Sequence, residues 1–199
     1  MLPTPTRSHY TFNLRDFSKV IMGVCMVKKE QVASTDVMIR LWTHEVVRVF
    51  GDRLINDEDR FWLLEALKDV VKRCFSSNFD VIFSHLDYNN SGKIDSVEEM
   101  RGLLWGDILA PFGMTIRPYE ELLDKAKVSE CVEGALEQYN LMSDKPMDLV
   151  LFSFAIEHLL RISRILKQPG GNALLVGVGG SGRQSLTRLA SKISDFDVF

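Results

Sequence analysis

The sequence predicts a mainly α-helical chain, with a helix-loop-helix near its middle and the opening of an α/β module at its C-terminal end. Apolar residues recur at helical spacing through the first three quarters of the 199 residues. A polar stretch runs from Asp87 to Glu98, and an apolar run at Ala173–Val176 leads into a glycine-rich stretch at Gly177–Ser185. Hydrophobic content of 46% with 26% charged residues is normal for a globular protein with a core of its own.

Charge and cysteine usage exclude several classes of function. A net charge of -3 gives no basic surface, so nucleic acid is not expected as a partner. The three cysteines are far apart and show no CxxC spacing, which argues against a disulfide framework or a zinc site and favours a reducing compartment. The longest apolar helical segment, Met147–Lys167, contains charged residues that a bilayer would penalise, so no membrane contact is expected.

Three amphipathic helices are predicted in the first 76 residues. The first begins after Asn13, whose side chain can cap it together with Asp16 three residues later. Its apolar stripe, expected to face the core, consists of Leu14, Phe17, Ile21 and Val24. A second helix follows Ser34 and a third follows Asn56, so the segment predicts a small helical bundle.

The helices further along the chain are interrupted by loops. A short helix ending at Leu86 enters the polar stretch, and an exit helix is expected through Met100 and Leu104. Pro111–Pro118 is the least regular segment. Further helices are predicted at Tyr119–Lys127, at Val132–Met142 and from Pro146 to the Pro169–Gly171 stop, followed by a strand at Ala173–Val176.

The glycine-rich stretch GVGGSGRQS joins this strand to a final helix and predicts a phosphate-binding loop. Backbone N–H groups beside glycines can close around phosphate oxygens, and a helix N-terminus adds partial positive charge. The predicted nucleotide ligands are Gly177, Val178, Gly179, Gly180, Ser181, Gly182, Arg183, Gln184 and Ser185. The predicted cofactor is ATP or ADP, with Mg²⁺ as its companion ion. The alternative is a glycine-rich turn with no ligand.

Two positions depart from the phosphate-loop pattern GxxxxGK[ST]. Arg183 replaces the lysine, keeping the charge and able to fork onto phosphate oxygens, while Gln184 replaces the hydroxyl that binds magnesium. Ser185 supplies a hydroxyl, but one residue later and about 100° further round the helix. We therefore expect nucleotide binding to persist better than hydrolysis. We also expect the rest of the nucleotide-binding module to lie outside these residues.

The polar stretch DYNNSGKIDSVE satisfies the twelve-residue EF-hand pattern and predicts a calcium site. The predicted oxygen ligands are Asp87, Asn89, Ser91, the carbonyl of Lys93, Asp95 and Glu98. Gly92 lies at the sharp turn and Ile94 at the apolar anchor position, but Glu99 stands where an apolar residue is common. The alternative is a capped helix-turn-helix whose polar side chains satisfy their own backbone.

Three segments resemble the heavy chains of dynein motors. They read NLRDFSKVI at Asn13–Ile21, RLWTHEVVRVFGDRLINDEDR at Arg40–Arg60, and LVLFSFAIEHLLRISRILKQPGGNALLVGVGGSGRQSLTRLA at Leu149–Ala190. The RQS form of the glycine loop resembles axonemal rather than cytoplasmic dyneins, and the polar stretch adds a resemblance to the single-headed inner-arm type. Such chains carry a ring of AAA+ modules in one polypeptide.

The resemblance implies a helical AAA+ lid with an EF-hand-like helix-loop-helix, followed by the truncated start of an α/β P-loop (AAA+) module. The implied segments are a lid at 1–76, the helix-loop-helix at 77–110, linker and helices at 111–146, and the next module at 147–199. This piece would join the third module to the fourth. Arg15 matches the family's sensor arginine, which reaches the nucleotide phosphates; the alternative is an exposed arginine in the first turn of a helix.

The implied partners belong to the parent motor. They are the rest of the heavy-chain ring and, through it, dynein light and intermediate chains and microtubules, in the cytoplasm, the cytoskeleton and the axoneme of a cilium. These residues alone are not expected to hydrolyse ATP, because no second strand with paired acidic residues follows the loop. A second class stays open: a stand-alone EF-hand protein that responds to calcium, with an incidental glycine loop.

Overall fold

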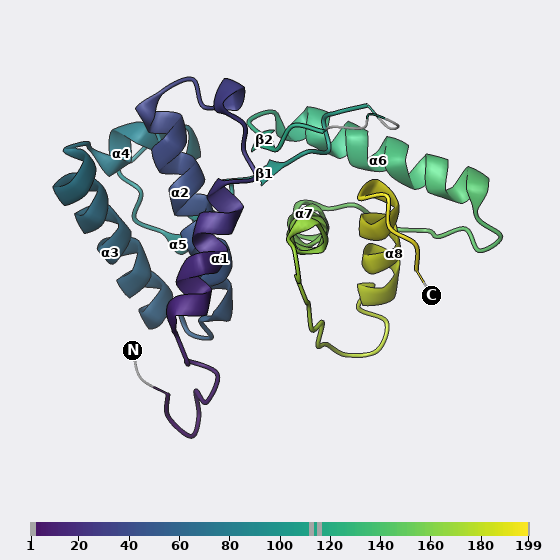
Figure 1. The fold of residues 1–199 in the computed structure, drawn as a ribbon, viewed down its shortest axis with the longest axis horizontal. Coiled ribbons are helices and arrows are strands. Elements are labelled where there is room, and N and C mark those ends of the chain that lie inside the picture. The colour runs from purple at the N-terminus through teal and green to yellow at the C-terminus, as the bar shows by residue number, and fades with distance from the viewer. Residues whose placement is uncertain (1–2, 112–113, 115–116, 199) are drawn as a thin grey trace. The chain divides into compact units, whose positions relative to one another are not determined.

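The computed structural model describes residues 3–111, 114 and 117–198, and the chain divides into two compact units, Met1–Leu103 and Leu104–Phe199. Each unit is built mainly from helices, which confirms the mainly α prediction (Figure 1). No helix among the described residues is long and apolar enough to cross a membrane.

The described residues of the first unit, 3–103, form five α-helices. They are α1 (Leu14–Val24), α2 (Thr35–Val49), α3 (Asp57–Phe75), α4 (Phe79–Ile82) and α5 (Val97–Met100), with short 3-10 turns at Lys29–Gln31, Gly51–Arg53 and Ser84–Leu86. α1 packs against α2, and α3 packs against α4 and α5. The capping box predicted at Asn13 and Asp16 is present, and the Ser34 hydroxyl accepts a hydrogen bond from the N–H of Val37.

The predicted buried face of α1 is wrong. Leu14 is 83% exposed and Phe17 59% exposed, whereas Asp16, Val20 and Gly23 are buried. On the buried side Asp16 forms an ion pair with Arg53, whose Nη1 lies 3.1 Å from Asp16 Oδ2. The helix therefore keeps an apolar stripe in solvent, which we name the α1 stripe: Leu14, Phe17 and Ile21.

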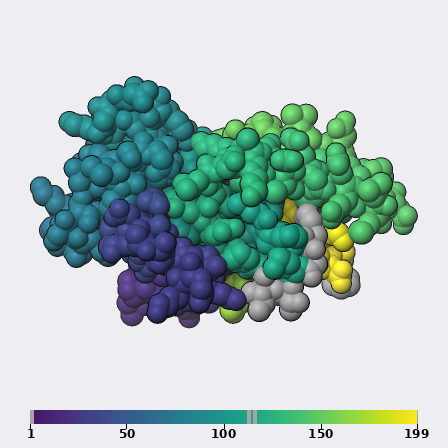
Figure 2. All heavy atoms as spheres, turned by 90° about the horizontal axis from the view of Figure 1, so that it is seen from above, coloured from purple at the N-terminus to yellow at the C-terminus, as the bar shows by residue number. Residues whose placement is uncertain are grey.

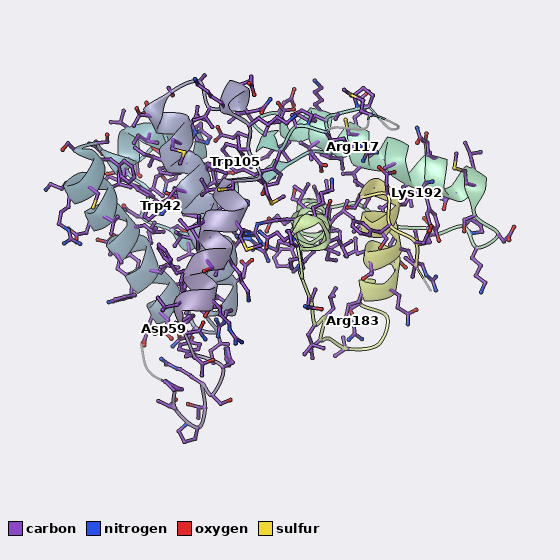
Figure 3. The ribbon with its side chains drawn as sticks, viewed as in Figure 1. Trp42, Asp59, Trp105, Arg117, Arg183 and Lys192 are labelled. Atoms are coloured by element: carbon purple, nitrogen blue, oxygen red, sulfur yellow. The ribbon has the colours of Figure 1, made fainter. Side chains whose placement is uncertain are left out.

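A buried tyrosine fixes the segment before α1. The hydroxyl of Tyr10 donates to Asp59 Oδ2 at 2.9 Å and accepts from the N–H of Ile55 at 3.1 Å. Arg7 Nη1 donates to the same carboxylate oxygen at 2.8 Å. Asp59, labelled in Figure 3, thus ties the N-terminal segment to the first turn of α3.

In the part of the second unit that the structure describes, the framework consists of three helices. They are α6 (Lys125–Met142), α7 (Ser153–Lys167) and α8 (Arg183–Ile193), preceded by a two-stranded antiparallel ladder of β1 (Trp105–Gly106) and β2 (Glu120–Glu121). α8 packs against both α6 and α7, and the outer side of α6 is turned to the viewer in Figure 2. The core that these helices share includes Val132, Leu159, Leu160, Leu189 and Ile193.

Several predicted elements of the second half differ from the structure. The exit helix ends at Met100, and the segment predicted as the helix Tyr119–Lys127 instead forms β2 and the first turn of α6. The helix predicted from Pro146 begins at Ser153. The predicted strand Ala173–Val176 is wrong too: it pairs with no described residue, and Leu174 is 90% exposed. A strand needs a neighbour for its backbone hydrogen bonds, and the described chain supplies none here.

An ion pair joins the end of α7 to the segment after β1. Lys167 Nζ donates to Asp107 Oδ2, and both side chains are largely buried. Burial lowers the pKa of Lys167 to about 8, and the negative charge of Asp195 opposes this shift. Lys167 is therefore mostly protonated at neutral pH, so the contact with Asp107 is ionic there.

Removing one partner of this pair tests its role. Lys167→Met leaves the Asp107 carboxylate buried without its cation, and the free energy of unfolding is expected to fall by about 3 kcal/mol. The double variant Lys167→Met/Asp107→Asn should recover part of that loss, because no uncompensated charge remains. Urea denaturation followed by circular dichroism measures both, and equal losses in the two variants would contradict the ionic assignment.

Glycine substitutions test the turn that ends α7. A Cβ added at Gly171 would lie 2.0 Å from the carbonyl oxygen of Ile165, a backbone atom, so Gly171→Ala should lower the free energy of unfolding by about 1 to 3 kcal/mol. The control is Gly134→Ala in α6, where nothing lies within 4 Å. This control should raise stability by up to about 1 kcal/mol through helix propensity. Equal midpoints of urea denaturation for Gly171→Ala and the unaltered chain would show that Gly171 does not pack against the Ile165 carbonyl as described.

Candidate functional site

The glycine loop lies between α7 and α8, and its conformation depends on two of its glycines. Gly180 has φ 78° and Gly182 has φ 73°, the left-handed region that L side chains avoid. Open space surrounds the position of a Cβ at both, so the backbone angle rather than a contact calls for glycine there. Figure 1 shows the loop turning back to enter α8 at its N-terminus.

The first turn of α8 presents backbone donors without a side-chain cap. Gly182 is the N-cap residue, no side chain caps the helix, and the first turn contains no acidic residue. The Gly182 carbonyl accepts from the N–H of Leu186 at 2.8 Å, which closes the first helical turn. Uncapped N–H groups at a helix N-terminus favour an anion, so this end of α8 suits a phosphate group.

Arg183 folds back onto the loop that precedes it. Its Nη2 donates to the carbonyl of Val178 at 3.1 Å and its Nη1 to the carbonyl of Leu175 at 3.4 Å. The side chain also passes Gly177, since its Cδ and Nε lie 3.5 Å from where a Cβ on that glycine would be. Figure 3 shows Arg183 at the start of α8 beside the loop. In this structure both terminal nitrogens of Arg183 are thus bonded to loop carbonyls, and its fork onto phosphate oxygens stays a prediction.

The remaining loop side chains are near the surface. Val178 and Gln184 are exposed, as are Gly179 and Ser181, whereas Ser185 is half-buried. The sequence prediction missed Thr187, whose hydroxyl donates to the carbonyl of Arg183 at 2.8 Å and holds the first turn of α8. A hydroxyl four residues after the loop arginine was the available signal, because threonine in a helix can bond to the carbonyl one turn earlier.

Arg15 belongs to the first unit. It lies in the first turn of α1, its side chain is exposed, and its N–H donates to Asn13 Oδ1 at 2.9 Å. The sensor role implied for it stays a prediction.

The polar stretch Asp87–Glu98 forms a tight turn held by its own backbone. Asp87 accepts from the N–H of Ser91 at 3.0 Å and of Gly92 at 2.8 Å, and Ser91 exchanges hydrogen bonds with Lys93. Gly92 has φ 77°, as the predicted sharp turn requires. Ile94, the predicted anchor, is fully buried.

Ser91 links four of the predicted calcium ligands, because it bonds to Asp87, Asn89 and the Lys93 carbonyl, whereas Asp95 and Glu98 pair with cations. Glu98 Oε2 accepts from Arg101 at 2.9 Å, and Asp95 Oδ1 lies 3.8 Å from Lys68 Nζ. The Asn89 amide oxygen accepts from the N–H of Ser91 at 2.9 Å. Across residues 3–111, 114 and 117–198, no three His, Cys, Asp or Glu side chains are grouped so as to hold a metal ion.

Two carboxylates that the calcium pattern ignored hold this loop in place. Glu99 accepts from the N–H groups of Asp95 and Ser96 at 3.0 and 2.9 Å and is buried, and Asp80 accepts from the N–H of Ile94 at 2.9 Å. Glu99 completes a capping box with Ser96 at the start of α5. The S-x-x-E spacing was the signal for it, so its departure from the EF-hand pattern has a structural reason.

Two family models match the chain. An AAA+ lid domain matches residues 1–87, and a P-loop containing dynein motor region D4 matches residues 147–199. The first match spans α1 to α4 and ends at Asp87, the first residue of the polar loop, and the second spans α7, the glycine loop and α8.

Similar proteins match the whole of this chain. Dynein axonemal heavy chain 12 of Mus musculus is 50% identical over 200 residues, which is 100% of this chain and 6% of that protein. Dynein axonemal heavy chain 3 of Mus musculus is 43% identical over 198 residues, and dynein axonemal heavy chain 1 of Homo sapiens is 43% identical over 199 residues; the chain covers 5% and 4% of these proteins.

The two family matches agree with the identity to axonemal relatives along the whole of this chain. The chain spans only about a twentieth of the length of the relatives it matches. It belongs to the axonemal dynein heavy chain family and corresponds to an AAA+ segment of those motors.

Proposed function

We propose that this chain is a ring-internal segment of an axonemal dynein motor that holds the phosphates of ATP or ADP in the loop Gly177–Ser185. The observation that carries the proposal is the start of α8: Gly182 is left-handed, and no side chain caps the helix. Free N–H groups at that position favour a phosphate group, and the match of residues 147–199 to a P-loop region supports the same assignment.

The segment would join the lid of the third AAA+ module to the opening of the fourth. The lid match at 1–87 and the name of the region matched at 147–199 support this order. Within the family we propose the single-headed inner-arm type, and within that type heavy chain seven, from the RQS form of the loop and the EF-hand-like stretch.

The nucleotide would act as a structural or regulatory ligand. Bound at the start of α8, it would stabilise one packing of the module that contains the loop and so bias the conformation of the ring. The departures Arg183 and Gln184 leave the lysine and the magnesium hydroxyl of the usual pattern unfilled, so we propose binding without hydrolysis by this segment.

The parent motor would supply the partners and the location. We propose that the segment contacts the rest of the heavy-chain ring and serves a machine that also contains light and intermediate chains and moves along microtubules. Its place would be the cytoplasm and cytoskeleton, in the axoneme of a cilium. The similarity to axonemal relatives extends over the whole of this chain, and it supports this proposal over a stand-alone EF-hand protein.

Calcium binding at Asp87–Glu98 is a second proposal, favoured by the backbone of that loop. The left-handed Gly92 and the buried Ile94 agree with the sixth and eighth positions of the EF-hand pattern, and Asp87 accepts hydrogen bonds from loop amides. Calcium would require Glu98 to leave Arg101, so weak affinity is expected.

The nucleotide proposal predicts a specific effect of one glycine. Alanine at the left-handed Gly182 is strained by about 1 to 2 kcal/mol, so Gly182→Ala should weaken ADP binding by about tenfold. The matched control is Gly170→Ala, which carries a similar strain at φ 66° in open space outside the loop. Isothermal titration calorimetry measures both dissociation constants. Saturable binding that is unchanged in Gly182→Ala, or no binding to the unaltered chain, would contradict the proposal.

The calcium proposal predicts opposite effects of two substitutions. Arg101→Met frees Glu98 and should tighten binding several-fold, whereas Glu98→Gln should abolish it. Asp69→Asn removes a carboxylate from an exposed pair on α3 and serves as the control. Terbium luminescence or calorimetry gives the affinities. The absence of a saturable signal below millimolar calcium in the unaltered chain and in Arg101→Met would end the metal assignment.

A further inference from the structure

We infer that Arg183 is a positioning residue that clamps the glycine loop through backbone carbonyls, leaving the phosphates to backbone N–H groups. The loop would then not distinguish ATP from ADP. This inference rests on the proposed nucleotide site and concerns the way that site selects its ligand.

The contacts of Arg183 span the first turn of the loop. Its two terminal nitrogens donate to the carbonyls of Leu175 and Val178, which lie on either side of Gly177 in the chain. Its Cδ and Nε each lie 3.5 Å from the position that a Cβ on Gly177 would take, which is ordinary van der Waals contact. The side chain of Arg183 therefore crosses the turn and bonds to the backbone on both sides of Gly177.

The geometry of a guanidinium commits it to these carbonyls. Its five N–H groups point in fixed directions in one plane, so both terminal nitrogens are oriented together. Turning the guanidinium to fork onto a phosphate would pull both terminal nitrogens away from the carbonyls of Val178 and Leu175, and this side-chain tie between the loop and α8 would weaken. A lysine differs, because its single ammonium can rotate its three donors between partners.

The clamp also holds the helix end that receives the phosphate. Arg183 is the first residue of α8, its carbonyl accepts from Thr187, and one turn on Leu186 is buried in the core. The N–H groups after Gly182 therefore stand on a fixed helix, and these are the donors left for an anion. Their attraction falls off within the first turn, so a third phosphate adds little.

The experiment compares ADP and ATP, each with Mg²⁺, in calorimetric titrations of the 199-residue chain. We expect the two dissociation constants to agree within about threefold. Arg183→Met removes the donors and should weaken both nucleotides alike, by about tenfold, while Arg183→Lys should recover part of the loss. Arg188→Met lies on the same helix, removes the same charge and should change neither constant.

A spectroscopic readout separates the clamp from a general loss of structure. In nitrogen-15 NMR spectra of the ligand-free chain, a guanidinium bonded to two carbonyls rotates slowly, so the two terminal nitrogens of Arg183 should give separate signals. These signals should persist when ADP or ATP is added. The corresponding signals of Arg188, assigned in the same spectra, should be averaged.

The outcomes are distinguishable. If the unaltered chain prefers ATP by more than tenfold and Arg183→Met removes that preference, Arg183 contacts the third phosphate and the clamp is overturned. Averaged Arg183 signals in the ligand-free chain, or nucleotide affinity untouched by Arg183→Met, overturn it as well. If neither nucleotide binds while the Arg183 signals stay separate, the nucleotide proposal fails and the clamp stands.

Discussion

The packing of α8 against α6 and α7 is the constraint on which the candidate site depends. Leu189 and Ala190 are fully buried in the shared core, and Arg117 donates to the carbonyl of Ile193 and pairs with Asp195 at the far end of the helix. The glycine loop itself is exposed and lacks a strand ladder. The loop ends at the N-terminus of α8, and apolar burial of the opposite face of that helix fixes where this N-terminus lies.

Elements specified by local signals were predictable, and elements that need a distant partner were not. Neighbouring residues in the sequence specify the caps at Asn13 and Ser34 and the start of α8 after Gly182. The structure confirms these three helix starts. The strand at Ala173–Val176 was wrong because a strand needs hydrogen bonds from another segment. The prediction for α1 was wrong because an apolar stripe defines a face but not the partner that covers it; the side turned inward contains Val20 and the pair of Asp16 with Arg53.

The two candidate sites show the same division. Positions that shape the backbone, such as Gly92, Gly180 and Gly182, could be read from residue type, since left-handed angles call for glycine. The partners of long charged side chains could not be predicted from residue type. Arg183 turned to its own loop, and Glu98 to Arg101, because flexible charged groups take whichever oxygen or cation the fold brings near. The predicted segment 77–110 likewise crosses the division at Leu103–Leu104, where the chain leaves the first unit to pair β1 with β2.

The α1 stripe and the unpaired residues Leu174 and Val176 place large apolar surfaces in water. In the ring proposed above, such surfaces would face neighbouring modules, whereas in a solution of this chain alone they meet only other copies of it. With a net charge of -3, repulsion between copies is weak. Self-association of the chain is therefore expected to rise with its concentration, and covering these surfaces with the proposed neighbouring modules would reduce it.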